Sequence, residues 1–60
     1  MRTKMIRITT EQARAKLAER RTRLARFIEL DAPEVIIAEE QRMIRDAIYA
    51  VETGELPVTY

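Results

Sequence analysis

The sequence has no cysteine, no histidine and no tryptophan, and it also lacks serine and asparagine. Ser/His/Asp and Cys/His catalysis are therefore excluded, because both need an imidazole beside a hydroxyl or thiol nucleophile. Zinc sites built on cysteine or histidine are excluded as well. With one glycine in 60 residues, the chain has no Gly-rich loop to hold a phosphate group. We expect a protein that is not an enzyme and that has no catalytic residues, no metal site and no cofactor.

The sequence is also without a long apolar run. A membrane-spanning helix needs about 20 consecutive apolar residues, whereas 35% of this chain is charged. The opening segment alternates charged and apolar side chains, unlike a signal peptide, which has an uninterrupted apolar region. We therefore expect no membrane partner and a cytoplasmic location.

The length of 60 residues predicts one small domain, residues 1–60. A domain of this size buries only about 60% of the surface that its unfolded chain exposes, so a single copy is marginally stable. Without cysteine or histidine, neither a disulfide nor a zinc site adds stability, which leaves self-association. We expect a homodimer or a larger assembly of this chain.

Capping signals predict a helix that begins after Thr9. Thr9 and Gln12 have the spacing of a capping box, and residues 11–30 contain neither glycine nor proline. This part of the chain is rich in Ala, Leu, Arg, Lys and Glu, which favour helices. We predict a helix over about 10–30, preceded by an extended segment at 1–9.

A second start signal follows at once. Asp31 is a residue type that favours the N-cap of a helix, and Pro33 suits the first helical turn. Gly54 is the residue type expected just after the last helical residue. We predict a second helix over about 33–53 and an extended tail at 54–60. The two extended ends are free to pair with each other or with the sheet edge of a neighbour.

The short connection between the predicted helices requires them to lie antiparallel as neighbours. The predicted fold class is therefore all-α, an antiparallel two-helix hairpin with short extended ends. The apolar stripe of the first helix is narrow, whereas the apolar arc of the second is wider than that stripe can cover. We expect the excess to pair with a second copy in a coiled-coil-like four-helix bundle. The stripe consists of Ala13, Leu17, Leu24, Phe27 and Ile28, and the residues predicted for self-association are Ile36, Met43, Ile44, Ala47, Ala50 and Val51.

Two charged residues, Arg20 and Glu40, fall in the middle of the predicted core, one on each helix. An unpaired charge in a dry core is strongly destabilising, so we expect a buried ion pair within or between hairpins. In the alternative, both side chains extend to water at the edge of the core.

Charge is unevenly divided along the sequence. The first thirty residues carry nine Lys or Arg against three Glu, a net +6, and the last thirty carry two Arg against seven Asp or Glu, a net −5. These halves attract each other in a hairpin. We expect most arginines of the first helix to form salt bridges with acidic residues of the second helix, across the hairpin or across the dimer. The alternative is that Arg21, Arg23 and Arg26 contact the phosphates of RNA or DNA.

The segment Glu29-Leu30-Asp31-Ala32 followed by Glu34 resembles the turn of the Rop family of plasmid copy-number regulators, as do the length and the hairpin plan. That family forms a two-hairpin bundle that binds paired RNA loops through one helix face. Pro33 and the bulky Ile and Met residues of the second helix depart from the Rop pattern. The resemblance implies a shared architecture, and we transfer no RNA-binding residues from it.

The side of the second helix that faces away from the predicted core carries apolar, arginine and tyrosine side chains. Tyr and Arg are favoured at the centres of protein interfaces. We therefore expect a non-enzymatic helical interaction or regulatory protein, of the kind that phages and plasmids encode, that self-associates and presents this surface to a protein partner. The alternatives are a Rop-like dimeric RNA- or DNA-binding bundle and a small structural subunit of a larger assembly. The residues predicted for partner binding are Val35, Arg42, Arg45 and Tyr49.

Overall fold

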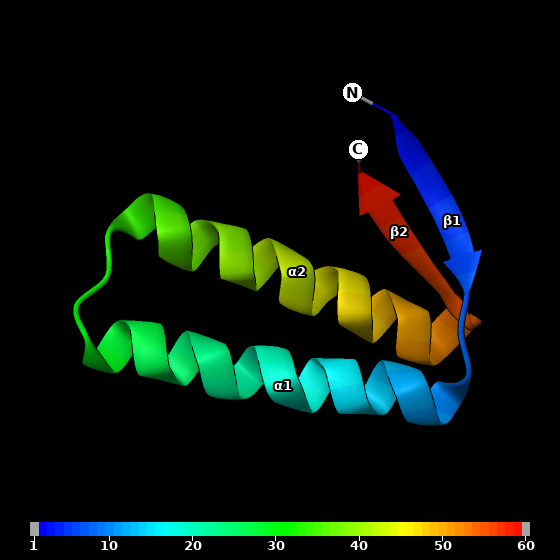
Figure 1. The fold of residues 1–60 in the computed structure, drawn as a ribbon, viewed down its shortest axis with the longest axis horizontal. Helices are drawn as coiled ribbons and strands as arrows, with labels where there is room; N and C mark the ends of the chain where they lie inside the picture. Colours follow the sequence, from blue (N-terminus) through cyan, green and yellow to red (C-terminus); the bar gives the residue numbers. More distant parts are fainter. Residues whose placement is uncertain (1, 60) are drawn as a thin grey trace.

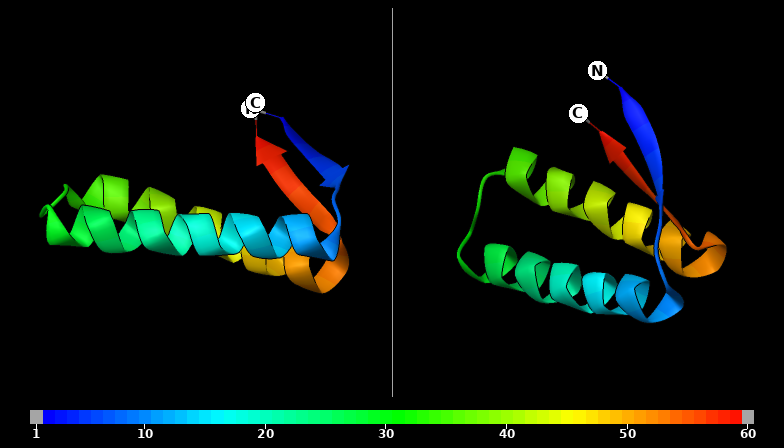
Figure 2. Two further views of the ribbon diagram at one scale, coloured as in Figure 1. Left: turned by 60° about the horizontal axis from the view of Figure 1, so that its bottom comes forward. Right: turned by 45° about the vertical axis from the view of Figure 1, so that its right-hand side comes forward.

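Two long helices and two short strands make up the protein (Figure 1). In the computed structural model, which describes residues 2–59, they follow the order β1 (Thr3–Arg7), α1 (Thr10–Glu29), α2 (Glu34–Thr53) and β2 (Glu55–Thr59). The helices run antiparallel beside each other, and the strands lie at the end of the hairpin opposite the turn (Figures 1 and 2).

The predicted helical hairpin with short extended ends is confirmed. The observed helices differ from the predicted ranges 10–30 and 33–53 only at their ends. Within the described residues, neither helix has the combination of length and apolar character that a membrane crossing requires. The predicted extended positions 1 and 60 lie outside the described residues, and the predicted dimer stays a prediction.

α1 begins with the predicted capping box. The Thr9 hydroxyl accepts a hydrogen bond from the Gln12 backbone N–H at 3.1 Å. The Gln12 side-chain oxygen accepts in turn from the Thr9 backbone N–H at 3.0 Å. These two bonds satisfy donors that the start of a helix leaves without an intrahelical partner.

α1 ends in a Schellman motif with Asp31 in its left-handed position. The Ala32 N–H donates to the Phe27 carbonyl at 2.9 Å, and the Asp31 N–H donates to the Ile28 carbonyl at 3.1 Å. This pair of bonds defines the motif. Asp31 has a φ of 56°, which glycine adopts readily and Asn or Asp adopts at some cost. Asp31 therefore terminates the first helix.

The prediction that Asp31 caps the second helix is wrong. Pro33 occupies the N-cap position of α2, and no side chain caps this helix. The Pro33 carbonyl instead accepts from the N–H groups of Ile36 at 3.0 Å and Ile37 at 3.2 Å. The pattern was ambiguous because aspartate is favoured at N-caps and also tolerates the left-handed conformation. At the other end of α2, Gly54 has the predicted role, with a φ of 78°.

β1 and β2 form a two-stranded antiparallel sheet in which Thr3 faces Thr59. The Ile8 N–H continues the pairing by donating to the Gly54 carbonyl at 3.0 Å. The extended ends thus pair with each other, one of the two arrangements left open by the sequence. β2 lies between β1 and α2 (Figures 1 and 2), and it is mostly half-buried, whereas β1 is exposed along its whole length.

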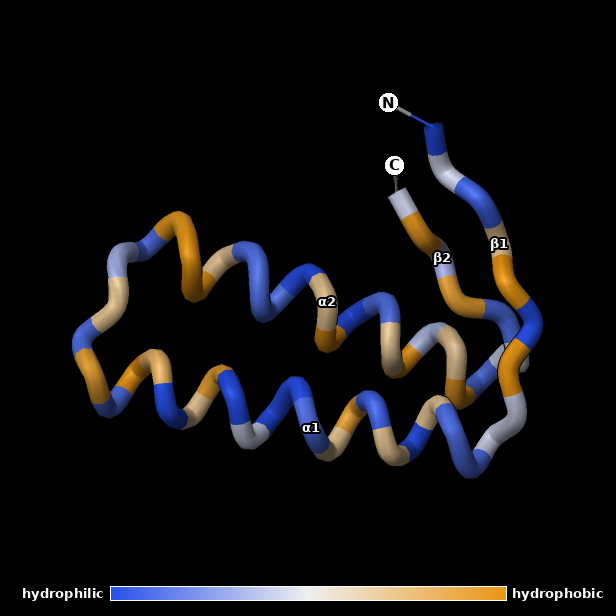
Figure 3. The backbone as a smooth tube through the Cα atoms, in the orientation of Figure 1, coloured by the Kyte–Doolittle hydropathy of each residue, from blue (hydrophilic) through white to orange (hydrophobic). Residues whose placement is uncertain are grey.

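The helices approach each other through small side chains. Ala13 of α1 and Ala47 and Ala50 of α2 are the buried apolar residues, with exposed fractions of 0%, 2% and 0%. Among the described residues, no large side chain is fully buried. Hydrophobic residues also lie around the turn and in both strands (Figure 3). Most large apolar side chains therefore contribute only part of their surface to the core.

Removal of the capping box should destabilise α1. We expect Thr9→Ala to lower the free energy of unfolding by about 1 kcal/mol, because the Gln12 N–H loses its acceptor. Thr10→Ala is the matched control, since Thr10 is exposed inside the helix and alanine favours helices. Urea unfolding followed by circular dichroism measures both variants. Equal losses in the two variants would contradict the role of Thr9.

A residue that adopts the left-handed conformation more readily than Asp31 should stabilise the protein. We expect Asp31→Gly to raise the free energy of unfolding by up to about 1 kcal/mol, because glycine adopts a positive φ without steric cost. Asp31→Ala should lower it, since alanine keeps the steric cost and loses the local polar contacts that help aspartate. Thermal unfolding of the three proteins gives the order of stability. A glycine variant less stable than the alanine variant would refute this explanation of the turn.

Candidate protein-docking surface

Large apolar side chains are exposed where the two helices meet at the turn. Ile28, in the last turn of α1, is 58% exposed, and Leu30, just after it, is 68% exposed. Val35 and Ile36, in the first turn of α2, are 70% and 40% exposed. We call these four residues the tip cluster. All four lie at the turn end of the hairpin.

The turn holds the tip cluster in a fixed arrangement. The Schellman bonds set the backbone on one side of Leu30, and the Pro33 carbonyl bonds set the backbone of Ile36. Full burial of a Val, Leu or Ile side chain contributes about 1.5–3 kcal/mol. A protein that covers Leu30 and Val35 therefore gains several kcal/mol without having to order a flexible loop.

The charges beside the tip cluster are acidic. Glu29, Asp31 and Glu34 lie in or next to the turn and are exposed. No Lys or Arg occurs in the sequence between Arg26 and Arg42. Complementary charge favours the correct partner and speeds its approach. The tip cluster thus fits an apolar cleft whose rim carries basic side chains.

The sequence pattern predicted this surface only in part. Val35 was expected among the partner residues, Ile28 in the core and Ile36 in a contact between copies. The placement of Ile28 is wrong, because the chain reverses directly after α1 and leaves this residue more than half exposed. Leu30 was not singled out. Apolar residues on both sides of the turn were the signal that pointed to this surface.

The residues predicted for partner binding do not form one compact surface. Val35 belongs to the tip cluster, whereas Tyr49, 44% exposed, lies near the opposite end of α2. The two residues are fourteen positions apart along the helix, which corresponds to about 21 Å. Arg42 donates to the Glu39 carboxylate at 2.9 Å on the same helix. Arg45 is exposed between these ends.

Two residues predicted for self-association, Ala47 and Ala50, are instead buried within one chain. The sequence pattern predicted that a second copy covers the wide apolar arc of α2. In the structure, β2 lies beside this helix and covers part of the arc. Of the other residues in this set, Ile36 is exposed, and Met43, Ile44 and Val51 are half-buried.

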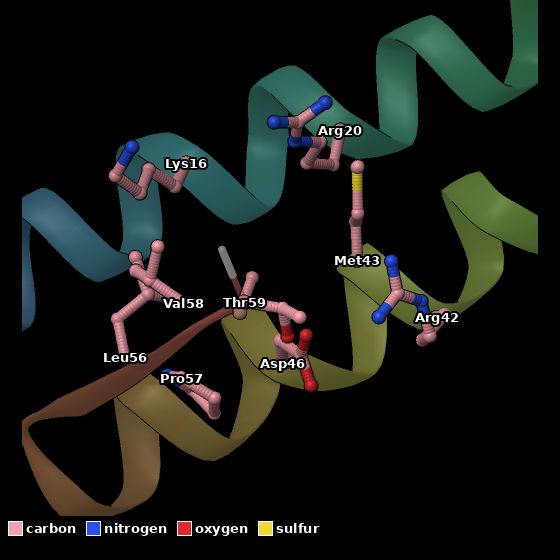
Figure 4. A pocket seen from close by; sticks show the side chains of 10 residues that line it. Lys16, Arg20, Arg42, Met43, Asp46, Leu56, Pro57, Val58 and Thr59 are labelled. Atoms are coloured by element: carbon pink, nitrogen blue, oxygen red, sulfur yellow. The ribbon is translucent and has the colours of Figure 1, made fainter. Parts of the chain in front are cut away.

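An open groove of about 290 Å³ separates β2 from the helices (Figure 4). It is lined by three cationic side chains, Lys16, Arg20 and Arg42, and by one acidic side chain, Asp46. Within the described residues, no group of three or more acidic side chains is placed to hold a metal ion. The charge of the groove favours an anionic group over a cation. Its other lining residues are Met43, Ala47, Leu56, Pro57, Val58 and Thr59.

Arg20 and Glu40 face each other across the hairpin, as the sequence predicted. An Arg20 guanidinium nitrogen lies 3.6 Å from Glu40 Oε1, which is longer than a hydrogen bond. Glu40 is only 6% exposed, and its Oε2 is buried without a hydrogen-bond partner in the described part of the chain. The Arg20 side chain keeps 30% of its surface exposed. The carboxylate is therefore buried with one weak ionic contact, while the arginine reaches the edge of the core.

The arginines proposed for phosphate contact, Arg21, Arg23 and Arg26, are exposed on α1. Within one chain, most arginines of this helix do not form the expected salt bridges across the hairpin, and salt bridges across a dimer stay a prediction. Over residues 2–59, Arg20 and Glu40 form the one ion pair that joins the helices. The helices meet through alanines, and the long charged side chains therefore extend into water beside the contact instead of into it.

Comparison with known proteins finds similarity to subunit beta′ of DNA-directed RNA polymerase. The chain is 50% identical over 36 residues to this subunit from Campylobacter fetus subsp. fetus, and 47% identical over 36 residues to that of Campylobacter jejuni. It is 48% identical over 33 residues to that of Vesicomyosocius okutanii subsp. Calyptogena okutanii. These matches cover 55–60% of this chain, which spans only 2% of the length of each subunit. No protein-family model and no solved structure matches the chain.

Every possible position of the matched stretch includes the turn. A stretch of 36 residues in a chain of 60 begins no later than residue 25 and ends no earlier than residue 36. The longer matches therefore contain the whole tip cluster. By the same reasoning, the match of 33 residues contains residues 28–33, and with them Ile28 and Leu30.

Because Glu40 is buried and Arg20 reaches water, the loss of either residue should change the free energy of unfolding differently. We expect Arg20→Met to lower the free energy of unfolding by roughly 1–3 kcal/mol, because it leaves a buried carboxylate unpaired. Glu40→Leu should be neutral or stabilising, since Arg20 already reaches water. The double variant should regain most of the loss. Urea unfolding of all four proteins gives the coupling free energy, and purely additive effects would show that the two side chains do not interact.

Proposed function

We propose that this chain is a non-enzymatic binding module whose tip cluster docks onto a protein of the bacterial transcription machinery. The partner is a transcription factor that binds RNA polymerase through the matching segment of subunit beta′. One observation carries the proposal. The stretch of 36 residues that is 50% identical to subunit beta′ necessarily includes the turn, where Ile28, Leu30, Val35 and Ile36 are exposed. The chain thus imitates a docking element of the polymerase.

The physical properties of the tip support binding as the role of this segment. Its apolar side chains stay in water in the isolated chain, at a cost that a partner removes. The backbone around them is fixed by hydrogen bonds, so little conformational entropy is lost on docking. The acidic rim of Glu29, Asp31 and Glu34 selects a basic surface.

The proposed mechanism is competition. A factor that is bound to this chain has its docking cleft occupied and does not engage subunit beta′ through the same cleft. The effect on transcription depends on the concentration of the chain relative to the polymerase, because both present a similar element. This role is regulatory, and it places the chain in the cytoplasm, where bacterial transcription takes place.

A second candidate function is direct contact with nucleic acid. It is favoured by the exposure of Arg21, Arg23 and Arg26, which form no ion pair in the described residues. Phosphate contacts weaken steeply as salt concentration rises, whereas an apolar docking surface does not. The salt dependence of binding therefore separates this candidate from the first.

The proposal is tested with purified components. Fluorescently labelled chain is titrated with each purified transcription factor that binds RNA polymerase, and anisotropy is recorded. We expect at least one factor to form a complex at physiological salt. We also expect a peptide with the 36 matched residues of the Campylobacter fetus subunit to displace the label. Complexes with nucleic acid alone would overturn the proposal in favour of the second candidate.

Variants locate the docking surface. Leu30→Asp should weaken the complex by about tenfold or more, because it removes apolar burial and places a charge in the cleft. Ala15→Asp makes the same charge change at an exposed position of α1 and should leave the affinity unchanged. Tyr49→Ala tests the alternative surface along α2. If Tyr49→Ala weakens the complex and Leu30→Asp does not, docking through the tip cluster is refuted.

A further inference from the structure

The outer edge of β1 is open. β2 lies between β1 and α2, so the other edge of β1 faces away from both helices (Figures 1 and 2). All five residues of the strand are exposed, including Met5 at 42% and Ile6 at 40%. An isolated two-stranded sheet is marginally stable, and further strands stabilise it.

The pairing of β1 with β2 decides which backbone groups face outward. The bond from Ile8 N–H to the Gly54 carbonyl marks these two residues as a hydrogen-bonded pair. Such pairs alternate along an antiparallel ladder, so Ile6 and Lys4 also bond to β2. The backbone groups of the intervening residues, Thr3, Met5 and Arg7, therefore point to the open edge.

The opposite edge of the sheet is blocked. Pro57 of β2 pairs with Met5, a position that does not bond across the two strands. The nitrogen of Pro57 therefore faces the other side of β2, where it has no hydrogen to donate. A sheet with one open edge and one blocked edge can pair with one other sheet only, so its association ends at a dimer.

We infer that β1 pairs antiparallel with β1 of a second copy, about a two-fold axis at Met5, to form a closed dimer with a four-stranded sheet. This inference is independent of the proposed function, because it does not involve the tip cluster. It also differs from the self-association through α2 that the sequence predicted. Backbone hydrogen bonds between the two strands and partial burial of the exposed Met5 and Ile6 side chains supply the driving force.

The register about Met5 follows from backbone direction and from charge. It pairs all five residues of β1, whereas a shift by two residues pairs only three of them. Lys4 then lies opposite Ile6 of the second copy, and Arg7 lies opposite Thr3. A shifted register centred on Lys4 would place lysine opposite lysine, which is destabilising. The register about Met5 therefore pairs the most residues of β1 and places no two basic side chains directly opposite each other.

Sedimentation equilibrium tests the inference. We expect the native chain to dimerise and Met5→Lys to raise the dimer dissociation constant by about tenfold or more, because two lysines meet at the two-fold axis. Ala15→Lys, at an exposed position of α1, is the control for added charge. Ile36→Lys tests the predicted contact through α2. Circular dichroism shows whether each variant keeps its helices.

Hydrogen exchange gives a second, residue-specific readout on the native chain. The amides of Thr3, Met5 and Arg7 should become protected as the chain concentration rises, whereas those of Lys4 and Ile6 should be protected at all concentrations. The basic residues of the paired strands repel each other, so dimerisation should also tighten with added salt. A monomer at every concentration, or a dimer that Ile36→Lys separates and Met5→Lys does not, would overturn the inference.

Discussion

The close approach of two helices through alanine is the contact on which the rest of the structure depends. Ala13, Ala47 and Ala50 allow the backbones to come near each other, but they bury little apolar surface. The larger apolar side chains along the helices are only half-buried. Most of the exposed ones lie at the turn and in β1.

These two places have different physical character. The tip cluster is a group of apolar side chains on a hydrogen-bonded turn with an acidic rim, and its proposed docking would rest on shape, apolar contact and charge. The edge of β1 is a row of backbone groups on a basic strand, and its proposed pairing would rest on hydrogen bonds to another strand. Because they lie at opposite ends of the hairpin, a chain that is paired through β1 still presents its turn (Figure 1).

Local signals were the reliable part of the sequence. The Thr9 capping box and the position of Gly54 were predicted from residues within one turn of each helix end, where the physical cause is local. The role of Asp31 was misassigned because two helix ends adjoin it, and both have a use for aspartate. The exposure of Ile28 depended on how far α2 extends beside α1, which no local pattern encodes.

Features that depend on contacts between distant parts of the chain were harder to predict, because no local pattern encodes them. β2 lies beside α2 and covers part of the apolar arc that the sequence pattern left for a second copy. Ala47 and Ala50 are buried where the two helices meet. The charge difference between the two halves predicted their attraction, but not the geometry of individual ion pairs. Over residues 2–59, only Arg20 and Glu40 form an ion pair between the two helices. Whether two charged side chains meet depends on the direction in which each leaves its helix, which net charge does not specify.

The pairing of Thr3 with Thr59 makes this hairpin suitable for insertion into another protein. Both ends of the described chain leave the helices side by side, as the two strands of a single stem (Figure 2). A stem of this kind can be spliced into a surface loop of an unrelated scaffold without stretching either connection. The paired ends therefore give the hairpin a single point of attachment to such a scaffold.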